Sequence, residues 1–590
     1  MLMNLRFVHI AGVRVKYGLA FIAILIAAGM LPSAHAQDAS PQLFPPDFAQ
    51  EAEDIDMGAK GSTYVPVDNW IYPALDRLYV LGYVDSAYFG LRPWTRMSIA
   101  HMLELCADRI VTDSNNDEAR ELYFAVLREV RPDFDRSPTL RHPHGELEST
   151  YTRLRGMNGT PLRDSFHLGQ TIVNDYGRPY ENGFSNSTGF STRAEGGPFS
   201  LYLRGEVQHA PPAAGYSAAL AAFLSNTLDS IPFTTNPQQD TIPKGPIAVA
   251  NDLRVMEANL SYNILGHEFS FGKNDHWLGP DMGASMLWSN NAENIYDFEI
   301  NRVEPLWIPF LSRFTGSFRY DFFVGSLKGH TYPNDPWVHV EKINFKPTAN
   351  VEFGFSRMVI WGGKGHEPVT LHTFLQSFFS FNNVSLAVKD SAKDPGARFG
   401  TFDFSYRLPH LRHWVTLYSD SLVHDSITPV ANPPRAGVHP GIYLARFPGI
   451  EHLDLRLEGA STDTPLATVQ TGQYLYWEYI QRQGPTNKGF LVGDWVGRQG
   501  KGGQAWLTYH LSPREEIQFT YRNAKGSLSF IPGGTTQNDY AFLVRKRIKK
   551  ELELSGSMQF ENWKAQIYKT GAQGDASFTG QLTWFPRDAK

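Results

Sequence analysis

The chain has 590 residues, with 54 Lys and Arg against 60 Asp and Glu, a formal net charge of -6 and 13% aromatic residues. This near balance of charge lacks the basic surface of a nucleic-acid-binding protein, and the single cysteine, Cys106, excludes an internal disulfide or a multi-cysteine metal site. A mean hydropathy of -0.32 excludes a many-helix membrane protein, because each spanning helix needs about 20 mostly apolar residues.

The first 36 residues have the order of a secretory signal peptide. Basic residues precede an apolar run at residues 19–31, which is followed by Ala34-His35-Ala36 and a polar stretch. The alternative, a membrane anchor, is disfavoured because the run of about 13 residues is too short to span a bilayer. We therefore expect export across the inner membrane, with cleavage after Ala36 and a linker over residues 37–66.

Residues 67–135 are predicted to form a small helical bundle. Thr95 is placed to cap the second of three expected helices, and Asn115 or Asn116 the third. The apolar residues recur at helical spacing in three groups: Leu75, Leu78 and Leu81; Ile99, Leu103 and Ile110; and Leu122, Val126 and Val130. A helical unit of this size is expected to pack against a larger domain.

From residue 145 to the end the dominant period becomes two, which is typical of half-buried strands. Residues 199–208 show the pattern, with Phe199, Leu201 and Val207 on one face and Arg204 and Glu206 on the other. Similar alternation occurs in segments that include Met256–Ile264, Leu453–Glu458, Ile517–Arg522 and Leu552–Phe560.

Two architectures place water on one strand face and apolar contact on the other. One is a soluble antiparallel sandwich, and the other is a transmembrane β-barrel with a wet interior. Segments of about ten residues favour the barrel, with roughly 16 to 20 strands over residues 145–590. We interpret the following aromatic residues, predicted at strand ends, as interfacial girdles: Trp414, Tyr418, Trp506, Tyr509, Trp563 and Tyr568.

Residues 578–585 form the expected closing strand, with Phe578, Leu582 and Trp584 on one face. Three connections are long and rich in proline or glycine: residues 211–249, 425–441 and 483–503. Long loops belong on the extracellular side of such barrels. These three are candidate ligand-binding or gating elements, with simple surface coverage as the alternative.

The common catalytic motifs are missing from the sequence. It contains no Gly-x-Ser-x-Gly elbow, no phosphate-binding loop and no His-Glu-x-x-His helix. His142-Pro143-His144 is interpreted as a pair of solvated histidines rather than a metal chelate. We therefore expect no enzyme activity, no cofactor and no metal.

Several stretches resemble the capsule assembly Wzi family, in the same order and over nearly the whole mature chain. The N-terminal ones are Tyr64-Val-Pro-Val-Asp68-Asn-Trp70 and Leu91-Arg92-Pro93-Trp94-Thr95-Arg96. The later ones are Gly272-Lys-Asn-Asp-His-Trp277-Leu-Gly279-Pro280, Ser289-Asn290-Asn291-Ala292, Phe355-Ser356-Arg357 with Trp361-Gly362-Gly363, and Gly489-Phe-Leu-Val-Gly493-Asp-Trp495-Val-Gly497-Arg498.

The resemblance implies an outer-membrane barrel of about 18 strands, closed at the periplasmic mouth by the helical bundle. It also implies a lectin that attaches capsular polysaccharide or exopolysaccharide to the cell surface. The expected partners are that polysaccharide, outer-membrane lipid and the polysaccharide export machinery, with no nucleic acid. A porin is the alternative function, and a hydrolase is a third hypothesis that lacks a supporting motif.

The family-like stretches supply candidate polysaccharide-binding residues: Asp275, His276, Trp277, Asn290, Asn291, Arg302, Arg357, Trp361, Trp495 and Arg498. Their polar and aromatic side chains suit hydrogen bonds to sugar hydroxyls and stacking on sugar rings. The same side chains suit packing of strand turns and of a polar lumen. Both interpretations stay open, and the long loops are the expected seat of polysaccharide specificity.

Overall fold

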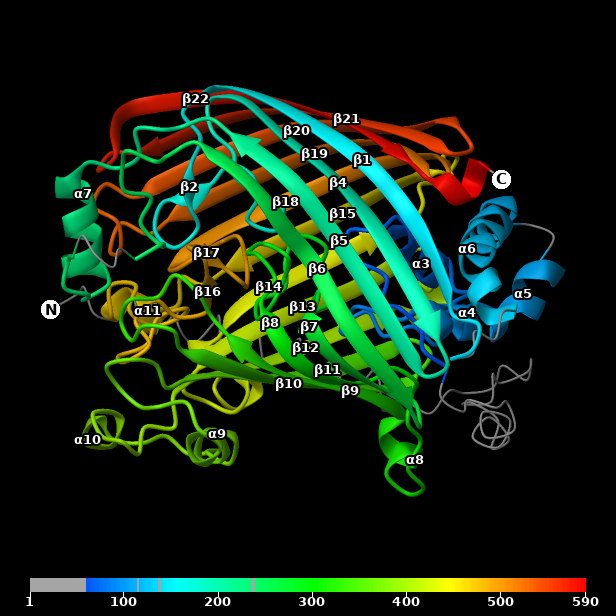
Figure 1. Cartoon of the computed structure of the whole chain (residues 1–590), viewed down its shortest axis with the longest axis horizontal. Coiled ribbons are helices and arrows are strands. Elements are labelled where there is room, and N and C mark those ends of the chain that lie inside the picture. The colour runs from blue at the N-terminus through cyan, green and yellow to red at the C-terminus, as the bar shows by residue number, and fades with distance from the viewer. Residues whose placement is uncertain (1–59, 114–115, 136–139, 235–238, 590) are drawn as a thin grey trace, which may run out of the picture. The chain divides into compact units, whose positions relative to one another are not determined.

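The computed structural model describes residues 60–589, apart from residues 114–115, 136–139 and 235–238 (Figure 1). The predicted signal peptide and all but the last residues of the predicted linker lie outside the described residues. The described part comprises nearly all of the predicted helical bundle and of the predicted barrel.

The main body is a closed antiparallel barrel of 18 strands, as predicted. Each strand is hydrogen-bonded to its neighbours along the chain, and β1 pairs with β22 to close the barrel, with Thr150 opposite Trp584. The strands are β1 (His144–Gly159), β4 (Gly183–Gly196), β5 (Phe199–Ala210), β6 (Ala250–Ile264), β7 (His267–Lys273), β8 (Tyr296–Arg302), β9 (Ser317–Ser326), β10 (Trp337–Thr348), β11 (Val351–Trp361), β12 (Ala397–Arg407), β13 (Val415–His424), β14 (Gly437–Leu444), β15 (Leu453–Ser461), β18 (Gly500–Ser512), β19 (Glu515–Gly526), β20 (Thr535–Lys549), β21 (Leu552–Ala565) and β22 (Lys569–Trp584).

The outer wall of the barrel is apolar and the inner wall is polar. On β5, Phe199, Leu201 and Val207 are exposed, whereas Arg204 and Glu206 are buried. A soluble sandwich would bury the apolar face instead. The observed polarity is that of a transmembrane barrel, whose apolar face meets lipid.

Some side chains depart from the predicted faces. Met256 is buried because a bulge in β6, where the register against β5 shifts, turns both it and Glu257 inward. The girdle assignment is wrong for Tyr418, Trp506 and Trp563, which are all at most 5% exposed. The indole N–H of Trp563 donates to the carbonyl of Thr160 at 3.0 Å, and period-two alternation alone does not say which aromatic residues face lipid.

One end of the barrel, which we call the helical end, carries the helices of the predicted bundle. They are α3 (Ile71–Val80), α4 (Arg96–Glu104), α5 (Ala107–Thr112) and α6 (Asp117–Asp135). The second predicted helix is split in two by a turn at Leu105 and Cys106. The predicted caps are present: Thr95 Oγ1 accepts the Ser98 amide at 3.1 Å, and Asn116 Oδ1 accepts the Ala119 amide at 3.1 Å.

Wall side chains hold the helical bundle in the barrel mouth. The Glu352 carboxylate on β11 accepts the backbone amides of Phe89 and Gly90 at 3.0 and 2.8 Å. The Arg407 guanidinium on β12 donates to the Tyr79 carbonyl at 2.7 Å. The apolar core of the bundle is continuous with inward-facing Tyr443 of the wall, so the bundle and the barrel fold as one body.

The opposite end, which we call the loop end, carries the long connections. Figure 1 shows α7, α9, α10 and α11 there, while α8 projects from the helical end. The remaining elements are α7 (Ala218–Phe223), the π-helical turn η1 (Leu224–Leu228), α8 (Ser312–Thr315), α9 (Leu371–Phe378), α10 (Leu386–Lys389), α11 (Pro465–Val469), the 3-10 turns η2 (Pro409–Leu411), η3 (Pro429–Ala431), η4 (Pro433–Arg435) and η5 (Pro586–Ala589), and the short pairs β2 (Arg163–Asp164) with β3 (Gly169–Gln170) and β16 (Thr486–Asn487) with β17 (Phe490–Leu491). Among the described residues, no helix combines the length and apolar character needed to cross a membrane.

Three of the loop-end connections fold largely into the lumen, and we call them the plug: residues 160–182, 274–295 and 462–499, of which α11 and its neighbours stay at the loop end. Apolar residues of all three, such as Phe166, Leu287 and Tyr476, pack with inward-facing wall residues such as Val340 in one buried cluster. The surface-coverage alternative is therefore wrong for residues 483–499, which are almost entirely buried.

Candidate functional site

Residues 274–295 lie inside the barrel and contain most of two family-like stretches, residues 272–280 and 289–292. This segment leaves the wall at the end of β7 and returns at Tyr296, the first residue of β8. Within it, Trp277 exchanges backbone hydrogen bonds with Arg92, the amide of each donating to the carbonyl of the other at 3.0 and 3.1 Å. Two stretches that carried the family resemblance, about 180 residues apart in sequence, thus meet in one bridge.

Asp275, His276 and Trp277 are each fixed by internal partners. Asp275 accepts the Val67 amide at 2.9 Å and the Tyr176 hydroxyl at 2.8 Å. The ring of His276 lies with Nε2 3.0 Å from an Asp297 oxygen. The Trp277 indole donates to the Asp281 carbonyl at 3.2 Å, and the Arg92 guanidinium lies over its ring. These contacts join the N-terminal segment, the plug and the wall.

Asn290 and Asn291 connect all three plug segments. The Asn290 carbonyl accepts the Tyr176 amide at 2.8 Å. Asn291 and Gln170 exchange amide hydrogen bonds at 2.8 and 3.0 Å, and Asn291 also donates to the Leu491 carbonyl at 3.0 Å. A buried amide pair of this kind satisfies both partners and fixes their positions.

Arg498 belongs to a buried charge network that the sequence did not predict. Its Nη1 donates to Asp229 at 2.6 Å, in the connection of residues 211–249. His167 lies between Asp229 and Asp164, with its two ring nitrogens each 2.9 Å from one carboxylate oxygen. Burial would lower the pKa of His167, but Asp164 and Asp229 outweigh it and raise that pKa to about 9. The imidazolium therefore joins two loop-end segments at neutral pH.

Trp495 and Arg302 occupy different places. Trp495 is buried in the plug, with the Arg522 guanidinium of β19 at 5.5 Å from its ring. Arg302 lies at the helical end of β8 and donates to the Leu265 carbonyl. The two are therefore not parts of one cluster.

Arg357 and Trp361 lie on the outer wall, beneath α9. Arg357 donates to the carbonyls of Ser377, Phe378 and Ser380 at 2.8, 2.7 and 2.6 Å, where α9 ends. Trp361 is 1% exposed because Phe374 of α9 covers it, with ring centroids 5.7 Å apart. This pair anchors a helix to the outside of the barrel.

The structure thus brings seven of the ten predicted residues into the lumen: Asp275, His276, Trp277, Asn290, Asn291, Trp495 and Arg498. All seven are buried, and the contacts above are internal. This arrangement supports the lumen-packing interpretation, and a role of these residues in binding polysaccharide stays a prediction.

A polar cavity of about 500 Å³ lies between the helical bundle, the plug and one side of the wall. A volume of this size is common for ligand pockets. Its hydroxyl, amide and aromatic side chains suit water or a hydroxylated ligand, and include Tyr151, Tyr202, Ser557, Gln559, Thr579 and Gln581.

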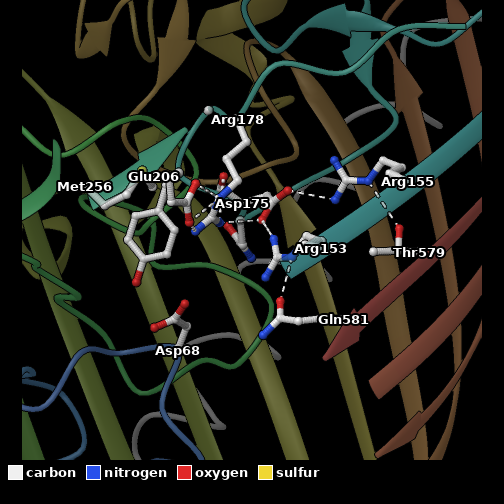
Figure 2. Close-up of polar contacts among 12 residues, drawn as sticks. Asp68, Arg153, Arg155, Asp175, Arg178, Glu206, Met256, Thr579 and Gln581 are labelled. Carbon is white, nitrogen blue, oxygen red and sulfur yellow. Dashed lines mark hydrogen bonds and ion pairs between the residues drawn. The ribbon is translucent and has the colours of Figure 1, made fainter. Parts of the chain in front are cut away.

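Asp175, at the edge of this cavity, forms ion pairs with three arginine side chains, and we call this group the Asp175 cluster (Figure 2). Arg153 and Arg155 reach it from β1 at 2.7 and 2.8 Å, and Arg178 reaches it from the plug at 2.7 Å. Burial alone would raise the pKa of Asp175, but the three guanidinium groups hold that pKa well below its usual range. Arg178 also pairs with Glu206 on β5 at 2.6 Å.

The sequence did not predict the Asp175 cluster. Arg153 and Arg155 stand at alternate positions of a strand, and that spacing is a signal for two inward guanidinium groups once β1 is assigned. Asp175 lies in irregular backbone inside the plug, where no periodicity marks it.

At the loop end, two aromatic side chains are open to solvent around one guanidinium. Tyr332 and Tyr479 are 38% and 36% exposed. The Arg482 guanidinium lies 4.4 Å from the Tyr332 ring centroid and 5.7 Å from that of Tyr479. We call Tyr332, Tyr479 and Arg482 the aromatic platform.

Comparisons with known proteins agree with this architecture. Wzi of Escherichia coli, described as an outer membrane protein involved in group 1 capsule assembly and as a carbohydrate-binding β-barrel, superposes with a TM-score of 0.63 at 16% identity, covering 88% of this chain and 99% of that one. An uncharacterized 55.8 kDa protein in the cps region of Klebsiella pneumoniae is 24% identical over 177 residues, which are 29% of this chain and 33% of that relative. The chain thus matches about a third of the length of this curated relative. Residues 153–577 match the family described as capsule assembly protein Wzi, and the chain belongs to that family.

Proposed function

We propose that this protein binds a capsular or extracellular polysaccharide from the outer membrane and holds it at the cell surface without transforming it. The observation that carries the proposal is the family match over residues 153–577. The similarity to Escherichia coli Wzi, which is described as a carbohydrate-binding barrel, supports the same class of ligand.

The lengths of the connections support a direction for the barrel in the membrane. At the helical end, neighbouring strands are joined by tight turns such as residues 265–266 and 513–514. At the loop end, connections such as residues 211–249 and 362–396 are far longer. Outer-membrane barrels keep short turns in the periplasm and long loops outside. We infer that the helical bundle faces the periplasm, where the export machinery stays a predicted partner.

The same direction places the aromatic platform outside the cell. Tyrosine rings offer flat apolar faces with polar edges, and the Arg482 guanidinium adds hydrogen-bond donors. Such a shallow surface binds each repeat of a polymer weakly, and many barrels on one cell compensate by avidity. We infer that the platform is the first contact of the polysaccharide.

The plug argues against the porin alternative. A porin needs an open aqueous lumen, whereas this lumen contains three buried segments that hydrogen-bond one another. The barrel therefore serves as a support for the loop end rather than as a passage.

The test is deletion of the gene from its host, with cell-bound and released polysaccharide measured separately. We expect the total amount to stay the same while polymer moves into the medium. If both fractions stay unchanged and uptake of a small solute falls, the attachment proposal fails and the porin replaces it.

Complementation then locates the contact. The double variant Tyr332→Ala, Tyr479→Ala removes both rings, and truncation of a central interface aromatic residue typically costs more than about 1 kcal/mol, or about fivefold in affinity. Val430→Ala is the matched control, because Val430 is an exposed apolar residue of the same end. Full retention of polymer by the double variant would exclude the platform as the binding surface.

A further inference from the structure

A group of buried side chains on β8, β9 and the plug has the arrangement of a cation site. Glu299 on β8 and Asp321 on β9 both point into the lumen, and His276 of the plug lies against them. One ligand atom from each of the three lies within 4.8 Å of the other two. All three residues are at most 2% exposed.

The group contains four buried polar atoms without a partner outside it. Within the described part of the chain, His276 Nδ1, Glu299 Oε2 and both carboxylate oxygens of Asp321 have no hydrogen-bond partner outside the group. Buried polar atoms are nearly always paired, because leaving one unpaired costs free energy. Four such atoms in one cluster therefore call for a shared partner.

His276 is held in the orientation of a metal ligand. Its ring stacks on Phe323, with centroids 3.8 Å apart and an angle of 13° between the planes. Its Nε2 lies 3.0 Å from Asp297, whose carboxylate fixes the proton on that nitrogen. Nδ1 is then free as a lone-pair donor and lies 3.9 Å from Asp321 Oδ2. A histidine whose second nitrogen donates to a carboxylate is the usual support of a metal-bound imidazole.

We propose that His276, Glu299 and Asp321 bind a divalent first-row transition-metal cation that fastens the plug to the barrel wall. The two carboxylates balance the charge of such an ion, and one imidazole with two carboxylates is a nitrogen and oxygen set that suits Zn²⁺ or Mn²⁺. With bonds of about 2.0–2.2 Å, ligand atoms around tetrahedral zinc are roughly 3.3–3.6 Å apart. The three side chains need to close by about 1 Å to reach that geometry.

The second acidic cluster of the lumen serves as an internal comparison. Asp281, His439 and Glu458 also lie within ligand distance of one another. However, both ring nitrogens of His439 already contact carboxylates, Asp494 at 2.5 Å and Glu458 at 3.1 Å. Glu458 also accepts the amides of Met282 and Gly283, each at 2.8 Å. An imidazolium therefore faces the Asp281 carboxylate, whose two oxygens make no hydrogen bond within the described part of the chain, and occupies the place that a cation would take.

The first experiment measures metal in the full-length barrel. The protein is refolded with an equimolar amount of Zn²⁺ at pH 7.5, dialysed and analysed by mass spectrometry for metal. We expect about one zinc per folded chain, whereas Asp321→Asn reduces that ratio at least tenfold. Asp281→Asn is the matched control, because it removes an equally buried carboxylate from the comparison cluster and leaves the zinc content unchanged.

The second experiment keeps the proposal testable if the Asp321 variant does not fold. Wild-type protein refolded with Co²⁺ should show the visible absorption of a nitrogen- and oxygen-ligated ion, and Zn²⁺ should displace it. Asp297→Asn leaves all three proposed ligands in place, removes the carboxylate that contacts His276 and Asn274, and should weaken zinc binding 10–100-fold.

The competing explanation is a proton shared between Glu299 and Asp321. In that case the wild-type barrel retains less than a tenth of an equivalent of zinc and shows no cobalt absorption. That result would overturn the cation site. It would leave the polysaccharide proposal untouched, because the aromatic platform shares no residue with the site.

Discussion

The imidazolium of His167 gives the plug a dependence on pH that can be measured. Its pKa is raised from an ordinary value of 6.5 to about 9, because Asp164 and Asp229 outweigh the effect of burial. A raised pKa means that the stabilisation is complete below about pH 6.5 and is lost as the pH rises through about 9. The shift corresponds to about 3 kcal/mol, since one pKa unit is worth about 1.4 kcal/mol.

We expect this loss to be local. His167 belongs to residues 160–182, Asp229 belongs to residues 211–249, and Arg498 ties Asp229 to the third plug segment. Hydrogen–deuterium exchange of peptides from residues 160–182 should therefore speed up between pH 6.5 and 9.5, beyond the intrinsic pH effect, by up to about 100-fold. Barrel strands that lie away from residues 160–182 should keep their protection from exchange.

Two variants separate this effect from general weakening at high pH. His167→Gln keeps hydrogen-bonding capacity but carries no charge. After correction for the intrinsic pH effect, its exchange should therefore be faster than that of the wild type at pH 6.5 and constant up to pH 9.5. His330→Gln is the matched control, because burial lowers the pKa of His330 to about 4 and its ring contacts the plug at the Thr486 carbonyl. If His167→Gln keeps the wild-type pH dependence, His167 is not the group whose loss of charge loosens the plug.

Three further outcomes are expected. Arg357→Gln should free α9 from the outer wall and expose residues 371–396 to protease, at a local cost of about 2–3 kcal/mol, while Arg302→Gln should not. Asp175→Asn should leave the buried Arg155 and Arg178 and the partly exposed Arg153 without their common carboxylate and lower the free energy of unfolding by about 3–5 kcal/mol, seen as a lower melting temperature by circular dichroism. N-terminal sequencing of the mature protein should begin at Gln37.

The strand pattern predicted the barrel because its period reports which residues share a face. Phe199 and Glu206 were assigned to opposite faces, and the structure confirms that assignment. The aromatic residues were harder to place, because Trp563 fills the lumen while Tyr509 is 40% exposed at the surface. A local bulge, such as the one at Met256, also has no mark in the sequence.

The site could be predicted only in part. The family-like stretches identified residues that the fold requires, and Trp277 and Asn291 do lie at junctions of the plug. Sequence alone could not separate these from Arg357, because an inward loop and an outer-wall anchor contain the same polar and aromatic residue types. Buried connections also read as surface loops: Asp175 has the glycine, asparagine and proline neighbours of an ordinary turn.

The contacts within the plug limit how this barrel can act. Moving one plug segment out of the lumen would separate His167 from Asp229 and Arg178 from Glu206, both buried pairs. Breaking a buried pair costs about 3–5 kcal/mol, so two pairs approach the whole stability of a typical domain, about 5–15 kcal/mol. Thermal opening would then be rare enough to carry no useful flux. Plug segments held this firmly fix the ends of the loops that they support. A fixed surface suits repeated weak contact with a long polymer, because each contact then avoids the free-energy cost of ordering a mobile loop.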